Sequence, residues 1–352
     1  MSKADSEITP LVVELLAKLG ASVESKQKVN GIILVREPTQ FSFGRASYEI
    51  TEVCNYRCSH CYLGHKTKNN LSVLDKKKII ELIEISGCIW LQITGGEPLL
   101  DKDFIEVYSY AYSLGFLVTI STNGSLLSEY QITDILKAYP PYRLTISVYG
   151  ATADSYEALT QTSGSFQKFM NGINWAKKTA IRTRLNIITT KYNQGEIDEM
   201  TDLAKNFGFE YYVFSTISPT ISGNSAPIEL MAQDCESIKK RNKFIPKEDC
   251  YTSCRAGQIS FHVNSVGNMS ICKTARESSV SLLYEGGIGF HKLFQFSKEL
   301  LNSPSLCSSC DSRKSCTTCP LILKLYLQSG LVPSFVCRKY YSKGGEKNES
   351  ET

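Results

Sequence analysis

The sequence is organised around the run Cys54-Asn-Tyr-Arg-Cys58-Ser-His-Cys61, in which three cysteines follow the spacing CxxxCxxC. The apolar segment 48–53 precedes this run and predicts a buried β-strand. Three thiolates on one loop can hold three irons of a 4Fe-4S cube and leave the fourth iron without a protein ligand. A structural zinc site is the alternative, but its closed set of four ligands would need His60 or His65 as the fourth. An iron with an open position is a reaction site, so the run predicts a catalytic metal centre.

From Tyr48 to about residue 216 the chain alternates between apolar and helical segments. Strands are expected at 48–53, 88–93, 116–121, 143–148, 183–189 and 210–216, and helices near 73–86, 102–114, 128–138, 165–179 and 196–207. This alternation predicts an α/β fold of parallel strands and crossover helices, in which six units curl into a partial (β/α)6 TIM-like barrel. Because the C-terminal ends of barrel strands meet at one rim, the residues that follow each strand are expected to form one site.

Polar motifs lie at these expected strand ends. Gly95-Gly96-Glu97-Pro98 follows the second strand, and its two glycines can bring backbone close to a ligand. Further candidates on the third, fourth and fifth strands are Ser121, Thr122, Asn123, Ser147 and Asn186. Each of these can also serve as a turn, cap or solvent-facing residue, so their position alone leaves the role open.

The cysteine run and the glycine motif together resemble the signature of the radical S-adenosylmethionine superfamily. The resemblance implies that the three cysteines bind a 4Fe-4S cluster whose open iron is chelated by the amino and carboxylate groups of S-adenosylmethionine. It further implies that His60 packs against adenine, and that the glycine motif holds the methionyl ammonium. The resemblance also implies that the ribose or carboxylate of S-adenosylmethionine is contacted by Ser121, Asn123, Ser147 and Asn186. One electron from the reduced cluster would break the S–C5′ bond, and the resulting 5′-deoxyadenosyl radical would abstract hydrogen from a substrate.

A second field of cysteines lies beyond the alternating segments. Its members are Cys250, Cys254, Cys272, Cys307, Cys310, Cys316, Cys319 and Cys337. Eight thiols are the number that two fully ligated 4Fe-4S clusters need, whereas one or two zinc ribbons are the alternative for paired CxxC motifs. The spacing resembles the SPASM extension of radical enzymes, although Cys316 and Cys319 are one residue closer together than in that pattern.

The SPASM resemblance implies two auxiliary clusters. It assigns the nearer cluster to Cys250, Cys254, Cys272 and Cys319, and the farther cluster to Cys307, Cys310, Cys316 and Cys337. Without Cys250 the nearer cluster would have an open iron, which would allow direct coordination of a substrate. Cys88 and Cys235 lie outside both patterns and are expected to be small core residues.

Four parts follow from these features. Residues 1–45 are expected to form an N-terminal helix/strand extension, 46–230 the radical S-adenosylmethionine partial barrel, 231–343 the SPASM auxiliary-cluster domain, and 344–352 a disordered tail without apolar residues to bury. The length of 352 residues and the 42% hydrophobic content suit one large domain and a smaller one.

Composition limits the partners and the compartment. A formal net charge of +4, with no dense basic block beyond Lys76-Lys77-Lys78 and the polar tail, gives no basis for nucleic-acid binding. The polar start is unlike a signal peptide, and no apolar run approaches the ~20 residues that cross a bilayer, so a cytoplasmic protein without membrane contact is expected. Thirteen cysteines in such a compartment favour metal ligation over disulfides.

Enzymes with a SPASM extension most often modify ribosomally made peptides. The resemblance therefore implies a maturase that acts on a peptide with a leader, forming an oxidative crosslink or another modification, and that receives electrons from a donor such as flavodoxin or ferredoxin. An anaerobic sulfatase-type maturase and a small-molecule radical dehydrogenase or epimerase are the enzymatic alternatives. A non-catalytic zinc-binding interaction protein is the alternative outside enzymes, and the glycine motif argues against it.

Overall fold

The computed structural model describes residues 14, 39–41, 43–67, 71–233, 254–301, 310, 318–333 and 336–337. The expected tail at 344–352 and most of the expected extension at 1–45 lie outside these ranges. Within the described ranges, no helix is both long enough and apolar enough to cross a membrane.

One sheet of nine strands, in the order β6-β5-β4-β3-β2-β1-β7-β8-β9, forms the framework of the molecule. Its six barrel strands run parallel to one another and are β1 (Arg45–Thr51), β2 (Trp90–Gly95), β3 (Leu117–Thr122), β4 (Arg143–Val148), β5 (Thr183–Ile188) and β6 (Glu210–Phe214). Parallel neighbours in chain order are what successive β-α units produce. The sheet curves but does not close, because β6 and β9 are its two ends. The predicted α/β fold with a partial (β/α)6 barrel is confirmed.

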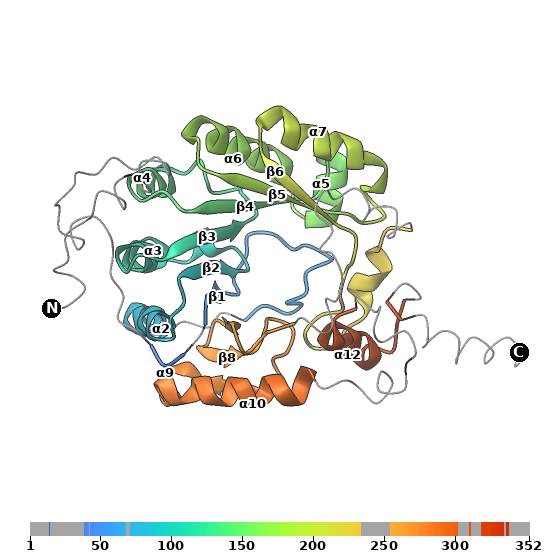
Figure 1. The fold of residues 1–352 in the computed structure, drawn as a ribbon. Coiled ribbons are helices and arrows are strands. Elements are labelled where there is room, and N and C mark those ends of the chain that lie inside the picture. Colours follow the sequence, from blue (N-terminus) through green and yellow to red (C-terminus); the bar gives the residue numbers. More distant parts are fainter. Residues whose placement is uncertain are drawn as a thin grey trace, which may run out of the picture.

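Helices cover the outer side of the curved sheet (Figure 1). They are α2 (Val73–Ile85), α3 (Phe104–Ser113), α4 (Tyr130–Ala138), α5 (Ala153–Thr160), α6 (Ser165–Thr179) and α7 (Ile197–Phe207). Each turns an apolar stripe toward the strands; in α2, for example, Ile79, Ile80 and Ile83 are fully buried. Helix α5 was not expected. It begins where the side chain of Thr152 accepts a hydrogen bond from the Ser155 N–H.

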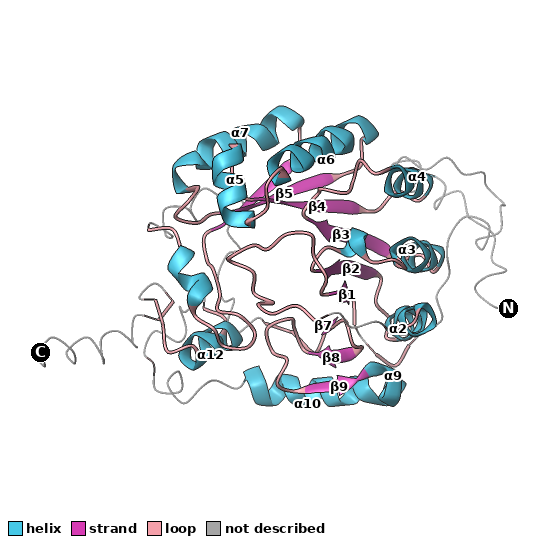
Figure 2. Ribbon diagram, turned by 180° about the vertical axis from the view of Figure 1, so that it is seen from behind, coloured by secondary structure: helices cyan, strands magenta, loops and turns pink. Residues whose placement is uncertain are grey.

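The described chain after residue 253 returns to the same sheet. Strand β7 (Ser260–Val263) runs parallel to β1, and β8 (Asn268–Ser270) and β9 (Ser279–Ser281) continue the sheet antiparallel. Helices α9 (Leu282–Glu285) and α10 (Gly289–Leu301) lie beside β8 and β9, and α12 (Pro320–Gln328) follows (Figure 2). Strands β7 to β9 share one hydrophobic core with β1 to β6. The expected domain boundary at residue 231 stays a prediction.

Apolar and polar side chains alternate along the strands, and the polar ones face the inside of the barrel. In β2 and β4 one set of side chains is fully buried in the hydrophobic core: Leu91, Ile93, Leu144, Ile146 and Val148. The residues between them line cavities on the other face and are Gln92, Thr94, Thr145 and Ser147. Successive side chains of a strand point to opposite faces, so each apolar run of the sequence also carries a polar interior row.

Candidate active site

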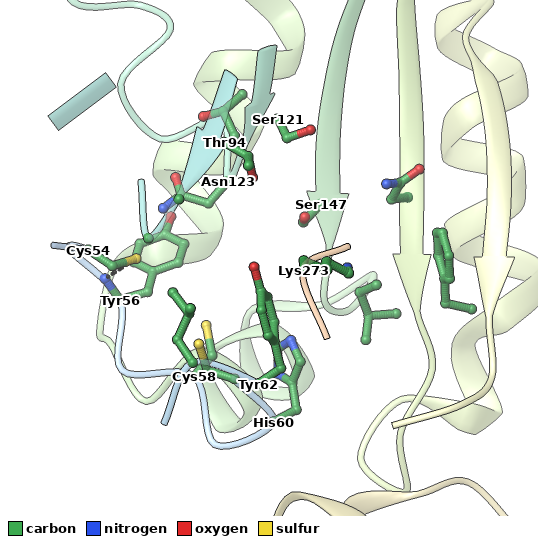
Figure 3. A pocket seen from close by; sticks show the side chains of 18 of the residues that line it. Cys54, Tyr56, Cys58, His60, Tyr62, Thr94, Ser121, Asn123, Ser147 and Lys273 are labelled. Atoms are coloured by element: carbon green, nitrogen blue, oxygen red, sulfur yellow. Dashed lines mark hydrogen bonds between the residues drawn. The ribbon is translucent and has the colours of Figure 1, made fainter. Parts of the chain in front are cut away.

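A cavity of about 420 Å³ lies at the C-terminal ends of the barrel strands. The loop after β1 contributes Cys54, Cys58 and Cys61 to its wall. Each of the strands β1 to β7 contributes at least one side chain, namely Ser47, Gln92, Thr94, Ser121, Thr122, Ser147, Asn186, Ile188, Phe214 and His262. Figure 3 shows Cys54, Cys58 and His60 facing Ser121, Ser147 and Lys273 across this space. The expected meeting of strand ends at one rim is therefore present.

Most of the residues expected to contact the cofactor line this cavity. They are Cys54, Cys58, His60, Cys61, Gly95, Gly96, Ser121, Asn123, Ser147 and Asn186. Glu97 and Pro98 do not line it; both are buried, and Pro98 begins the short 3-10 helix η3 (Pro98–Leu100). The individual contacts of these residues with a cofactor stay predictions.

The glycine motif holds the cysteine loop in place. The N–H of Gly96 donates to the Thr51 carbonyl and the N–H of Glu97 donates to the Val53 carbonyl, each at 2.9 Å. Val53 directly precedes Cys54, so these two bonds fix the point at which the loop leaves β1.

The two glycines allow the backbones to approach this closely. A Cβ atom on Gly95 would lie 2.1 Å from the Thr51 carbonyl oxygen, and one on Gly96 would lie 2.3 Å from that of Glu52. Gly95 also has a φ of 144°, which side chains rarely allow. The sequence predicted a close approach of backbone to ligand; the approach in the structure is between two segments of the protein itself.

Glu97 joins the glycine motif to the end of β3. Its Oε1 accepts hydrogen bonds from Thr122 Oγ1 at 2.7 Å and from the Leu99 N–H at 3.1 Å, and its Oε2 accepts from the Asn123 N–H at 2.7 Å. Burial raises the pKa of this carboxyl to about 7, although the three hydrogen bonds act in the opposite direction. Glu97 thus positions residues that line the cavity without facing the cavity.

A ring of side-chain bonds attaches the cysteine loop to the loop after β3. Asn123 Nδ2 donates to Asn55 Oδ1 and Asn55 Nδ2 donates to Ser125 Oγ, both at 2.8 Å. The N–H of Ser125 donates back to Asn123 Oδ1 at 2.9 Å. Asn55 is the residue between Cys54 and Tyr56, so the loop is held from inside the cysteine run.

The cysteines are partly buried beside a cation. Burial raises the pKa of the Cys54 and Cys58 thiols, while the charge of Lys66 acts in the opposite direction. Lys66 lines the cavity and its Nζ donates to the Tyr56 carbonyl at 2.8 Å. Metal ligands must be thiolates, so a positive charge at this wall favours the ligating form.

The three thiols fit the ligand set of a cluster. Among the described residues, no group of three His, Cys, Asp or Glu side chains could hold a single metal ion. A 4Fe-4S cube makes a different demand, because each thiolate binds its own iron. Three cysteines on one loop, facing a common cavity with a free side, meet that demand.

His60 forms a flat, uncharged part of the wall. Burial, followed by the charge of Lys66, lowers the pKa of His60 to about 4, so the imidazole is neutral near pH 7. Its ring lies 5.1 Å from that of Tyr149, at an angle of 54°. Its buried Nδ1 has no hydrogen-bond partner in the described part of the chain. This pair of rings offers a partly apolar surface that a planar ligand could pack against.

Sequence reasoning missed the wall that β1 and β7 provide. Ser47 Oγ and His262 Nδ1 are 2.8 Å apart and both residues line the cavity. Lys273 also lines it, with its Nζ 4.9 Å from the centre of the Tyr62 ring. Inward-facing Ser47 could have been found from the alternation along β1, whereas His262 and Lys273 depend on the unexpected strand β7 and the turn after β8.

A buried ionic group supports this wall. Glu49 Oε1 accepts from Arg276 Nη2 at 2.6 Å and from the Tyr62 hydroxyl at 3.0 Å. Burial opposes ionisation of Glu49, but His262, whose Nε2 lies 3.7 Å from Oε2, and the bonded Arg276 outweigh it and lower the pKa to about 2. The carboxylate is therefore charged and joins β1 to the segment that follows Cys272.

Some cysteines of the second field come together in the described ranges. Cys254, Cys272 and Cys319 are partly buried and pack against the main core. Burial raises the pKa of the Cys319 thiol, and the nearby Cys272 and Cys254 raise it further. Cys337 packs instead against a smaller apolar cluster around Tyr326. Cys310 is described, whereas Cys250, Cys307 and Cys316 lie outside the described residues. Both auxiliary ligand sets stay predictions.

The rim of this partial barrel carries three cysteines on a loop that the glycine motif holds in place. This arrangement is typical of barrel proteins that depend on a cofactor. Residues 48–221 match the family model of the Radical SAM superfamily, and the chain belongs to this superfamily. Membership implies a 4Fe-4S cluster and S-adenosylmethionine as cofactors.

Curated relatives carry several activities. Over 197 residues the chain is 32% identical to the AdoMet-dependent heme synthase of Methanosarcina barkeri, which covers 54% of this chain and 55% of the relative. Over 300 residues it is 25% identical to the mycofactocin maturase MftC of Mycobacterium ulcerans, covering 77% of this chain and 80% of the relative. The chain thus spans about half the length of the heme synthases that it matches.

Solved structures share the fold. Streptococcus suis SuiB bound to S-adenosylmethionine superposes with a TM-score of 0.64 at 17% identity, covering 84% of this chain and 78% of SuiB. A second crystal structure of SuiB, bound to the precursor peptide SuiA, gives a TM-score of 0.60 at 17% identity and covers 87% and 81%. At this identity the likeness concerns the fold alone.

Proposed function

We propose that this protein is a radical S-adenosylmethionine enzyme that modifies a ribosomally made peptide by hydrogen abstraction. The observation that carries the proposal is the 420 Å³ cavity in which three cysteines of one loop face polar side chains from six strands. Likeness to mycofactocin maturase over most of both chains, and to the fold of SuiB, supports a peptide rather than a small molecule as substrate.

Cys54, Cys58 and Cys61 would hold the cluster at the free side of the cavity. A reduced cluster supplies one electron to S-adenosylmethionine, whose cleavage gives a 5′-deoxyadenosyl radical. His60 and Tyr149 would pack against the adenine of the cofactor. Hydroxyl and amide groups suited to its ribose and carboxylate are those of Ser121, Asn123, Ser147 and Asn186.

Residues on the wall formed by β1 and β7 would orient the substrate. Lys273, Ser47 and His262 present an ammonium, a hydroxyl and an imidazole to the cavity. These groups can bind carbonyl or carboxylate oxygens of a peptide. Holding the reacting hydrogen still and excluding water both favour transfer to the radical over side reactions.

The second field of cysteines would remove the electron that remains after hydrogen abstraction. In this assignment Cys250, Cys254, Cys272 and Cys319 hold the nearer auxiliary cluster, and Cys307, Cys310, Cys316 and Cys337 the farther one. Cys272 directly precedes Lys273, which lines the cavity, so the nearer set would lie next to a substrate bound there. The SPASM domain would occupy 231–343 beside a barrel at 46–230, and a flavodoxin or ferredoxin would supply the first electron.

A small-molecule substrate is the second candidate. It is favoured by the 32% identity to a heme synthase, which is higher than the identity to the mycofactocin maturase but covers a shorter part of the chain. The choice between the two depends on which substrate consumes the radical.

The test uses anaerobically reconstituted full-length protein, dithionite and S-adenosylmethionine. We expect 5′-deoxyadenosine in the native protein and in Cys88→Ala, whose cysteine is buried away from the cavity, and none in the triple Cys54→Ala, Cys58→Ala, Cys61→Ala variant. Added precursor peptide should lose one pair of hydrogens per crosslink in mass spectrometry. Cleavage that persists in the triple variant, or stoichiometric zinc in place of iron, would overturn the proposal.

A further inference from the structure

The opposite end of the barrel carries a second cavity, of about 130 Å³. Its walls come from β1 to β5 and consist of Arg45, Trp90, Gln92, Thr119, Arg143, Thr145 and Arg184. Strand register places these side chains together: Gln92 pairs with Thr119, Thr119 with Arg143, and Thr145 with Arg184. Arg45 and Arg143 are the first residues of β1 and β4, so the cavity lies at the N-terminal ends of the strands.

Three guanidinium groups share this small space. Burial, followed by the charge of Arg143 and also that of Arg45, lowers the pKa of Arg184, because these two like charges lie near it on the cavity wall. Glu210 acts in the opposite direction, but its Oε1 accepts hydrogen bonds from Arg182 at 2.7 and 3.2 Å. The charge on the cavity wall is therefore strongly positive.

Two polar atoms of this wall are buried without a hydrogen-bond partner among the described residues. They are Arg143 Nε and Thr145 Oγ1. Buried donors nearly always find an acceptor in native proteins, from protein, water or ligand. A ligand that carries several acceptor oxygens and negative charge would satisfy both atoms and relieve the repulsion between the arginines.

We propose that Arg45, Arg143 and Arg184 form a binding site for a phosphate group at the end of the barrel opposite the cysteines. Planar guanidinium groups bind phosphate oxygens in pairs, which is why arginine is favoured at phosphate sites. A phosphate near its dianionic form matches three guanidinium charges better than a singly charged carboxylate. The site does not depend on the proposed peptide substrate.

The phosphate group can be free or part of a nucleotide. A nucleotide would have to leave its nucleoside outside so small a cavity. Trp90 lies on the wall, with its ring centre 5.9 Å from the guanidinium carbon of Arg45, and offers an aromatic surface beside the charged groups. The two sources therefore share the arginine contacts and differ in what they place beside Trp90.

The two cavities are joined by side chains. Gln92 lines both of them, and its Nε2 donates to Ser121 Oγ at 2.7 Å. Arg184 Nε donates to Asn186 Oδ1 at 3.1 Å, and Asn186 lines the larger cavity. A group bound to Arg184 and near Gln92 thus contacts residues that position two candidate cofactor ligands. Phosphate is expected to change the affinity for S-adenosylmethionine by a few-fold, a coupling that must be reciprocal.

The test measures thermal unfolding of the reconstituted full-length protein with saturating S-adenosylmethionine, so that phosphate cannot act at the cofactor site. Sodium phosphate is compared with sodium chloride at equal ionic strength. We expect a saturable rise in Tm with phosphate alone. Arg143→Gln and Arg184→Gln should each weaken the apparent affinity at least about tenfold. Lys168→Gln is the control and should keep the full response, because Lys168 is an exposed cation on α6 and does not line the cavity.

Arg143→Gln also separates loss of the site from loss of the fold. It removes a like charge and an unpartnered buried donor, so its Tm without phosphate should equal or exceed that of the native protein. Equal effects of phosphate and chloride, or a phosphate response retained in Arg143→Gln, would overturn the proposal. An ADP arm identifies the source: affinity at least tenfold above that of phosphate assigns a nucleotide, and equal or lower affinity assigns free phosphate.

Discussion

The two cysteine regions of this protein are built in different ways. Cys54, Cys58 and Cys61 lie on one loop, which hydrogen bonds from the loops after β2 and β3 hold against β1. Cys254, Cys272 and Cys319 come from distant segments and meet by packing on the core. The first arrangement is local and depends on neighbours that are not cysteines, whereas the second depends on closing long loops of chain. A mutation should therefore be able to damage one region and leave the other intact.

The largest expected effect is the loss of a cluster from the second region alone. Cys319→Ala removes one of the thiols grouped with Cys254 and Cys272, so we expect iron content to fall by about four atoms per chain. The hydrogen bonds that hold the loop of Cys54, Cys58 and Cys61 do not involve Cys319. Some cleavage of S-adenosylmethionine should therefore remain. Iron analysis and 5′-deoxyadenosine assays check this, with Cys88→Ala as control. Unchanged iron content would show that Cys319 is not a ligand of any cluster.

Gly96→Ala should damage the first region without touching a cysteine. The added Cβ would lie 2.3 Å from the Glu52 carbonyl oxygen and 2.4 Å from that of Val53, so the cysteine loop must move. We expect formation of 5′-deoxyadenosine to fall at least about a hundredfold, which corresponds to ~3 kcal/mol. Gly195→Ala is the control, because nothing lies within 4 Å of its Cβ position. Native rates in Gly96→Ala would show that the loop is not fixed by this contact.

Glu97 should make stability depend on pH. Burial raises its pKa in the folded state from 4.5 to about 7. Its contribution is therefore full below about pH 4.5 and is lost as pH rises through about 7, by up to ~3 kcal/mol. Urea unfolding between pH 5 and 8 should show this decline in the native protein and a flatter profile in Glu97→Gln. Exposed Glu199→Gln should keep the native profile, and an equal slope in all three proteins would contradict the assignment.

Asn55→Ala should have the smallest effect on the first region. It removes the hydrogen bonds to Asn123 and Ser125 and should lower the free energy of unfolding by about 1–2 kcal/mol. A looser cysteine loop is also expected to weaken the affinity for S-adenosylmethionine by up to about tenfold. Isothermal titration checks the affinity, and Asn174→Ala on the exposed side of α6 is the control. An affinity equal to that of the native protein would mean that the ring of bonds does not position the loop.

The strand pattern was readable because each barrel strand is an apolar run. Strand β4 at Arg143–Val148 and helix α6 at Ser165–Thr179 have the expected bounds, and the other barrel strands differ by a few residues. Helix α5 and the strands and helices after residue 253 were not predicted. Helix α5 is short and polar at its start, and β7 has only four residues. Strand β7 exists because it pairs with β1, from which it is separated by more than two hundred residues of sequence.

The site was predictable where a motif marks a strand end. Residues inside a strand were harder, because which side chains face the interior depends on the phase of alternation and on the partner strands. Ser47, Gln92 and His262 belong to this group and line the cavity. Glu97 shows the opposite case, since its place in the glycine motif suggested a cofactor contact while its carboxylate is buried against β3.

Lys66 has a consequence for electron transfer. Its ammonium faces the cavity beside Cys54 and Cys58 and is held by the Tyr56 carbonyl. A fixed positive charge near an iron–sulfur site stabilises the form that carries one more electron, because the added charge is negative. The midpoint potential of a cluster held by these cysteines would thereby be raised, and a correspondingly milder reductant would suffice to reduce it.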